Sequence, residues 1–160
     1  MNDTIAGELR DTMRDLVRLF STPLVINSVV PREDATVYRA INGTITGTTA
    51  LTVWDPPVGT TFVLKGYLVD AIVDTAVAAT AGPVACYFAD SADTNRVVAP
   101  IGTFLDNAAE GVALSRDVPE MSSGRRGSSA TANLVITTNA TIGAGVIRFA
   151  GVVWGDEVPA

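Results

Sequence analysis

The chain of 160 residues contains no histidine, one cysteine (Cys86) and one lysine (Lys65). Histidine is the usual general base and metal ligand near neutral pH, and a nucleophilic serine or cysteine normally needs such a base beside it. No G-x-S-x-G turn, phosphate-binding glycine loop, H-E-x-x-H or C-x-x-C pair occurs either. We therefore expect a protein that is not an enzyme and that carries no metal and no cofactor.

Charge is also scarce. Charged residues make up 18% of the chain, whereas about 25% is typical of soluble domains. The formal net charge of −6 disfavours nucleic acid as a partner, because affinity for phosphates rests on clustered lysine and arginine. No apolar run approaches the ~20 residues needed to span a bilayer, and residues 1–20 are too charged for a secretory signal. We expect a protein made in the cytoplasm that binds neither nucleic acid nor membranes.

Residues 1–22 differ in pattern from the rest of the chain. Five apolar side chains recur there at steps of three and four residues, which is typical of one stripe of an α-helix, and Pro23 would end that helix. The helix could pack on its own domain, it could be an arm that packs on a neighbouring subunit, or the segment could be a frayed terminus. A single domain is predicted over 23–160, because one domain is usual at this size. The apolar stripe consists of Ile5, Leu9, Met13, Leu16 and Phe20.

Short β-branched runs separated by proline, glycine and asparagine follow from residue 24 onward. Asn42-Gly43 and the segment 55–59 are typical of turns. About eight strands without an intervening helical pattern predict an all-β fold, an antiparallel β-sandwich or jelly roll. The predicted strands lie near 24–30, 35–42, 49–54, 60–73, 83–88, 95–101, 131–138 and 145–154.

Both faces of two predicted strands are apolar. A β-sandwich in water normally alternates apolar inward and polar outward side chains. Two apolar faces predict that the outer one is covered by another layer, most simply another subunit. In 145–154 one face carries Val146, Arg148, Ala150, Val152 and Trp154, and the other carries Ile147, Phe149, Gly151 and Val153. In 60–73 the corresponding sets are Phe62, Leu64 and Leu68 against Val63, Lys65, Tyr67 and Val69.

The choice of cations favours the same conclusion. Ten of the eleven basic residues are arginine, which is common at interfaces, whereas the edge strands of monomers are often protected by lysine. We predict a homo-oligomer, most simply a trimer. Compositional drift in the source genome is the alternative explanation.

The segment between Phe104 and Ala130 has no clear periodicity. Connections this long are uncommon in compact domains and are often functional. Gly124 and Gly127 flank Arg125 and Arg126, which favours a mobile tip. The tip could contact another subunit or partner, or the segment could be a solvated loop.

Three further features allow more than one interpretation. Asp90, Asp93 and Asn95 could supply oxygen ligands to calcium, but their spacing departs from an EF-hand and also suits a capped turn. Trp54 and Trp154 could stack on a sugar, although core or interface packing is the more frequent role of tryptophan. Adjacent carboxylates at residues 156 and 157 would point to opposite faces of a strand, which disfavours a carboxylate-based hydrolase.

The whole composition resembles that of small β-sandwich virion proteins of tailed bacteriophages. The resemblance rests on an acidic, histidine-free, Thr/Ala/Val-rich chain with a charged N-terminal arm and the run from Leu51 to Ala71. It is closest to capsid decoration, or cement, proteins.

That resemblance implies a trimer in the virion that clamps neighbouring subunits of the major capsid protein or other virion subunits. A head-fibre or tail-tip domain that binds a host glycan is the alternative. The candidate interface residues are Ile5, Leu9, Met13, Leu16, Phe20, Arg125, Arg126, Arg148 and Trp154.

Overall fold

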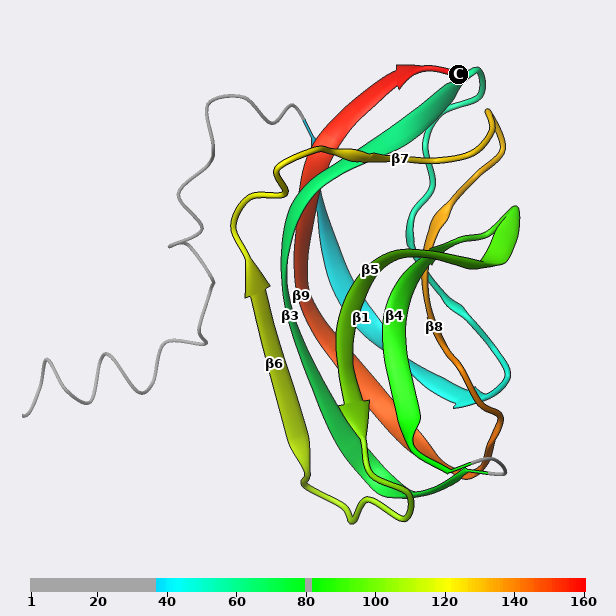
Figure 1. Ribbon diagram of the computed structural model, residues 1–160, viewed down its shortest axis with the longest axis vertical. Helices are drawn as coiled ribbons and strands as arrows, with labels where there is room; N and C mark the ends of the chain where they lie inside the picture. The colour runs from blue at the N-terminus through cyan, green and yellow to red at the C-terminus, as the bar shows by residue number, and fades with distance from the viewer. Residues whose placement is uncertain (1–36, 80–81) are drawn as a thin grey trace, which may run out of the picture. The chain divides into compact units, whose positions relative to one another are not determined.

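Two antiparallel β-sheets pack face to face in the computed structural model, which describes residues 37–79 and 82–160 (Figure 1). The predicted all-β sandwich is confirmed. The predicted N-terminal helix over 1–22 and the predicted strand near 24–30 lie outside the described residues. The strands are β1 (Val37–Gly47), β2 (Leu51–Trp54), β3 (Thr60–Ala79), β4 (Val84–Asp90), β5 (Asp93–Phe104), β6 (Ala113–Val118), β7 (Arg125–Arg126), β8 (Leu134–Thr138) and β9 (Ile142–Pro159).

The order of the strands is that of a jelly roll. The first sheet has the order β1-β9-β3-β6, with the short β7 pairing β3, and the second sheet has the order β2-β8-β4-β5. Leaving β7 aside, each sheet therefore mixes early and late strands of the chain, as two interlocked Greek keys require. Of the two predicted architectures, the general β-sandwich and the jelly roll, the structure shows the more specific one, the jelly roll.

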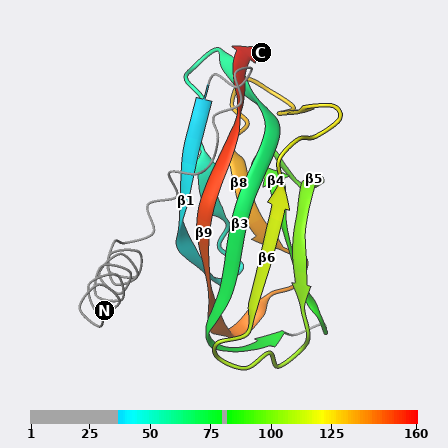
Figure 2. The ribbon, with the colours of Figure 1, turned by 90° about the vertical axis from the view of Figure 1, so that its left-hand side faces the viewer.

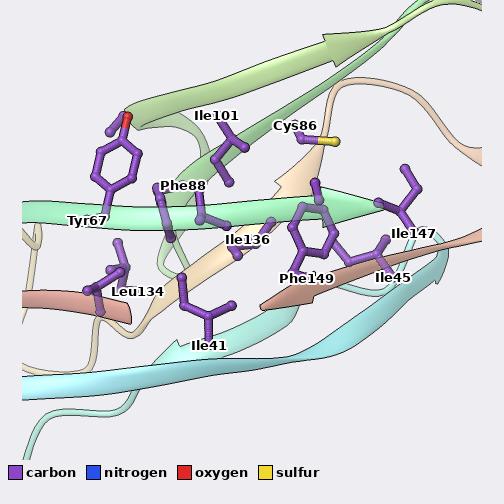
Figure 3. Packing of buried hydrophobic residues seen from close by; sticks show 14 of the residues in the cluster. Ile41, Ile45, Tyr67, Cys86, Phe88, Ile101, Leu134, Ile136, Ile147 and Phe149 are labelled. Carbon is purple, nitrogen blue, oxygen red and sulfur yellow. The ribbon is translucent and has the colours of Figure 1, made fainter. Parts of the chain in front are cut away.

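The core lies between the sheets, and the labelled side chains in Figure 3 converge there from both of them. Tyr67 and Phe88 pack edge to face with ring centroids 4.9 Å apart, and the Tyr67 hydroxyl donates to the carbonyl of Pro100 on β5. Burial raises the pKa of Tyr67, while a hydrogen bond from Arg116 and its charge act in the opposite sense. This hydroxyl therefore ties the two sheets together at the side where β5 faces β6.

A bulge in β3 changes which side chains face the core. Pairing with β9 shifts register between Leu64 and Gly66, and such an extra residue reverses the alternation that follows. Tyr67 is consequently buried with Phe62 and Leu64, and Leu68 is only half-buried. The predicted grouping of Leu68 with Phe62 was wrong for this reason.

The predicted turn at Asn42-Gly43 was also wrong. Both residues lie inside β1, and a Cβ added at Gly43 would collide with the side chain of Leu51 on β2. The glycine thus serves close packing rather than a turn. The chain turns instead after β1, where the amide of Thr49 donates to the carbonyl of Thr46.

The segment between Phe104 and Ala130 is not one long loop. It contains β6, which pairs with β3 along the edge of the first sheet, and the two-residue strand β7. The sequence pattern did not predict β6 because of the polar run Ser115–Asp117. An edge strand with one solvated face needs few apolar residues.

Candidate interaction surface

The outer face of the first sheet is the surface that Figure 2 turns toward the viewer, with β1, β9, β3 and β6 side by side. On β9 the alternation predicted from the sequence is confirmed, since Ile147, Phe149 and Val153 are buried toward the core. The other face of β9 is the outer one, where Val146 and Val152 are half-buried. On the neighbouring strands, Ala40 and Leu68 pair with Val152, and Ile72 pairs with Arg148.

Two ion pairs lie on this outer face. Arg148 Nη2 is 3.0 Å from Asp74 Oδ1, and Lys65 Nζ is 2.9 Å from Asp156 Oδ2. Each pair joins β3 to β9. Pairs as exposed as these add little stability, but they neutralise charge that would otherwise oppose contact with an apolar partner.

Trp154 belongs to the outer face and is nevertheless only 5% exposed. It pairs with Gly66 across β3 and β9, and a Cβ on Gly66 would lie within about 2.6 Å of the indole ring. The ring therefore rests directly on the glycine backbone. The indole Nε1 finds no acceptor among the described residues.

Trp54 is 1% exposed and closes one end of the core beside Phe62, with ring centroids 6.1 Å apart. Its Nε1 donates to Glu157 Oε1 at 2.9 Å, and Arg39 Nη2 donates to the same oxygen at 2.9 Å. The carboxylate thereby links β1, β2 and β9. Neither tryptophan presents a free ring face on which a sugar could stack.

Arg125 and Arg126 lie on β7, which is fixed in place rather than forming a mobile tip. The amide of Gly127 donates to the carbonyl of Phe62 at 2.9 Å, and Arg96 Nη2 donates to the carbonyl of Arg126 at 2.9 Å. The Arg126 guanidinium in turn donates to the carbonyl of Pro159. The two arginine side chains are exposed on this pinned strand.

A buried carboxylate holds the residues that follow β7. Asp90 is fully buried and accepts hydrogen bonds from the amides of Ser128 at 2.6 Å and Ala92 at 2.9 Å. Arg96 Nη1 approaches it to 3.3 Å. Burial raises the pKa of the Asp90 carboxyl, but hydrogen bonds from Ser128 and Ala92 and the charge of Arg96 outweigh it and hold the pKa below its usual value.

This arrangement is a capped turn. Protein donors occupy both oxygens of Asp90, and Asp93 Oδ1 caps the turn locally by accepting from the amide of Asn95 at 3.2 Å. Within residues 37–79 and 82–160, no group of three or more His, Cys, Asp or Glu side chains could hold a metal ion. The same part of the chain has no helix long and apolar enough to cross a membrane.

The outer face of the second sheet carries a hollow of about 370 Å³. It forms where the pairing of β4 with β5 loses register at several points. The Cys86 side chain belongs to the core, and burial raises the pKa of its thiol to about 12, so the thiolate that would react is scarcely populated at neutral pH. The hollow is lined by Ala85, Cys86, Tyr87, Val97, Pro100, Gly102, Thr103 and Asn139, none of them charged.

The predicted interface residues are therefore distributed over several places. Arg148 and Trp154 share the outer face of the first sheet, whereas Arg125 and Arg126 lie on β7. The apolar stripe of residues 5–20 lies outside the described residues. Sequence reasoning missed both cross-strand ion pairs and the role of Asp90, because strand register alone brings these partners together.

Comparison with known proteins gave one structural likeness. No protein-family model and no curated protein match this sequence. A solved structure described as the cyanophage Pam1 capsid asymmetric unit aligns over 84% of this chain and 100% of its own, with 14% identity and a TM-score of 0.39. An identity and a TM-score this low establish neither a shared fold nor a shared function.

Proposed function

We propose that the chain is a structural virion protein, a decoration or cement protein that binds the assembled head of a tailed bacteriophage. It acts as a homo-oligomer, most simply a trimer, with the major capsid protein or another virion subunit as its partner. The work of such a protein is binding alone, which suits a chain without histidine.

The observation that carries this proposal is the size and character of the outer face of the first sheet. Its strands have 11, 18, 20 and 6 residues. At ~3.3 Å per residue and ~4.8 Å between strands, they span roughly 900 Å². A standard protein interface buries ~800 Å² on each partner. This face, with apolar side chains at its centre, is thus large enough for one such interface.

The two tryptophans favour a structural role over glycan binding. A sugar platform needs an accessible aromatic ring, and Trp54 and Trp154 are used inside the chain, against Phe62 and Gly66. Their burial supports a scaffold that meets its partner through a flat sheet.

Residues 1–22 are the second element of the proposal. The amphipathic pattern of this segment and its separation from the β-domain by Pro23 suit an arm that reaches a neighbouring subunit. Deleting residues 1–22 should leave the thermal transition of the β-domain nearly unchanged and weaken attachment to the particle. Failure of the truncated chain to fold would refute the arm.

A cement protein stabilises a shell through linkage. A ligand that binds only the assembled lattice stabilises it by RT ln(1 + [L]/Kd), about 2.7 kcal/mol per site at a hundredfold excess over Kd. Repetition over many sites makes the effect on the particle large. The geometry needed is a rigid, preformed face, and the two-sheet domain provides one.

Reconstitution tests the proposal. The protein is stripped from its particle, the rupture temperature of the head is measured, and purified protein is added back. Stripping should lower the rupture temperature, and addition should restore it. Equal temperatures with and without the protein would refute the cement role.

A point variant locates the contact. Val152→Arg puts a charge in the apolar centre of the outer face, so this variant should fail to restore the rupture temperature. Thr103→Arg, an exposed change on the second sheet, is the matched control and should restore it. Equal restoration by both variants would show that the outer face is not the contact.

A further inference from the structure

The arginines of β7 have no carboxylate partner among the described residues. Arg125 and Arg126 are exposed, and the Arg126 guanidinium donates only to a carbonyl, that of Pro159. The remaining cations of the described chain all have a side-chain partner. Arg116 hydrogen-bonds the Tyr67 hydroxyl, and ion pairs engage Arg39, Lys65, Arg96 and Arg148.

These two free cations are also held in a fixed position. Hydrogen bonds anchor β7 to Phe62 on one side and to Asp90 on the other, through the amides of Gly127 and Ser128. Figure 1 shows β7 crossing the open edge of the sandwich between the two sheets. Because the backbone is already ordered, less conformational entropy is lost when the arginines bind a partner.

Two carboxylates on the outer face of the first sheet are likewise without an ion-pair partner among residues 37–79 and 82–160. Asp117 pairs with Leu68, and Asp70 pairs with Ser115 two positions along. The carboxylates are therefore diagonal neighbours on the sheet, ~7–8 Å apart at the backbone. Like charges at this spacing repel each other. Other charges on the face cancel within the ion pairs of Lys65 and Arg148.

We propose that Arg125 and Arg126 of one copy bind Asp70 and Asp117 of a second copy of this chain, with the half-buried Leu68 at the contact. The guanidinium fork suits carboxylates, and such charge-assisted hydrogen bonds are the stronger ones. Two unpaired cations then meet two unpaired anions. This inference rests on the homo-oligomer within the proposed function and identifies its interface.

The two patches are compatible with two kinds of symmetric assembly. In a twofold dimer the arginines of each copy meet the carboxylates of the other, and in a head-to-tail arrangement each copy uses one patch to bind the next copy. Such a heterologous contact forms a closed ring when the rotation between copies closes. The trimer of the proposed function corresponds to the head-to-tail arrangement.

Charge reversal tests the contact in the full chain by sedimentation velocity at micromolar concentration. One variant carries Arg125→Glu and Arg126→Glu, a second carries Asp70→Arg and Asp117→Arg, and a third carries all four changes. Each double variant should weaken self-association by at least about tenfold. The fourfold variant should recover it to within about threefold of the wild type. Asp93→Arg with Glu110→Arg, which makes the same change of net charge as the second double variant at exposed positions elsewhere, should leave self-association unchanged.

The outcomes separate this contact from the proposed function. Recovery in the fourfold variant supports the contact, since general charge effects and misfolding would not be reversed by two further changes. A fourfold variant that stays dissociated, double variants that associate normally, or a monomeric wild type each overturn it. Dissociation of the second double variant only, without rescue, would indicate that another segment such as residues 1–22 binds the carboxylates. Binding to the phage head is measured separately, so a monomer that still raises the rupture temperature would refute the contact and leave the cement role standing.

Discussion

Replacing Asp90 by asparagine should destabilise the domain by about 3 kcal/mol. The fully buried carboxylate accepts from two backbone amides, those of Ser128 and Ala92. A hydrogen bond to a charged acceptor is worth ~1.5–3 kcal/mol. Asparagine retains one oxygen and turns an NH₂ group toward the other amide. Loss of the ion pair with Arg96 adds under ~1 kcal/mol, because that side chain is partly solvated.

The stabilisation by Asp90 should also decrease as the pH is lowered. The folded-state pKa of Asp90 lies below its usual value of 3.8, so near that pH the unfolded chain binds more protons than the folded one. The contribution of Asp90 is therefore complete above about pH 5 and is lost as the pH falls through 3.8 toward the folded-state pKa. The stability difference between wild type and Asp90→Asn should shrink over the same interval.

Urea denaturation of the full chain at fixed protein concentration, from neutral pH to pH 3, measures both effects. At neutral pH the variant should also melt roughly 10 °C below the wild type. Asp93→Asn, in the same turn but exposed, is the control and should stay near the wild type. A loss below about 0.5 kcal/mol for Asp90→Asn, or stability profiles that remain parallel down to acid pH, would refute the anchoring role of this carboxylate.

Two substitutions and one labelling experiment test the packing around the core. Gly66→Ala should cost about 2 kcal/mol or more and shift tryptophan fluorescence, because its Cβ would displace the Trp154 indole; unchanged emission and stability would contradict the stacked geometry. Cys86 should resist a thiol reagent in the native state and react after unfolding, since it is buried and its pKa is raised to about 12; rapid native labelling would show that the core opens to the reagent in the folded state. Tyr67→Phe should cost about 1 kcal/mol in denaturant unfolding through loss of its hydrogen bond to Pro100, and a neutral result would show that this bond adds no net stability.

The sequence predicted those parts of the fold that depend on uninterrupted alternation. Along β9 the residues from Val146 to Trp154 alternate as expected, so both of their faces could be assigned. Along β3 the assignment failed after Gly66, because a bulge leaves no unambiguous trace in the order of apolar residues. The turn prediction at Gly43 failed for a related reason. In the sequence, a glycine that makes room for a neighbouring side chain cannot be distinguished from a glycine that a turn requires.

The candidate surface was predictable only in part. The alternation within β9 alone places Arg148 on an apolar outer face. Its ion pair with Asp74 depends on the register between β9 and β3, which the sequence pattern does not determine. Asp70 and Asp117 escaped notice because β6 was not recognised as a strand, and only that strand brings Asp117 beside β3.

The strand order of the first sheet also determines at which stage of synthesis its outer face can form. β9 lies between β1 and β3, although it is the last strand in this sequence. While the ribosome is still making residues 142–159, the early strands have no central neighbour, and sheets built from such distant segments fold slowly. The surface proposed to hold subunits together thus comes into being only after residues 142–159 have been made. Chains that still lack β9 cannot join an assembling particle through it, so the topology itself orders folding before assembly.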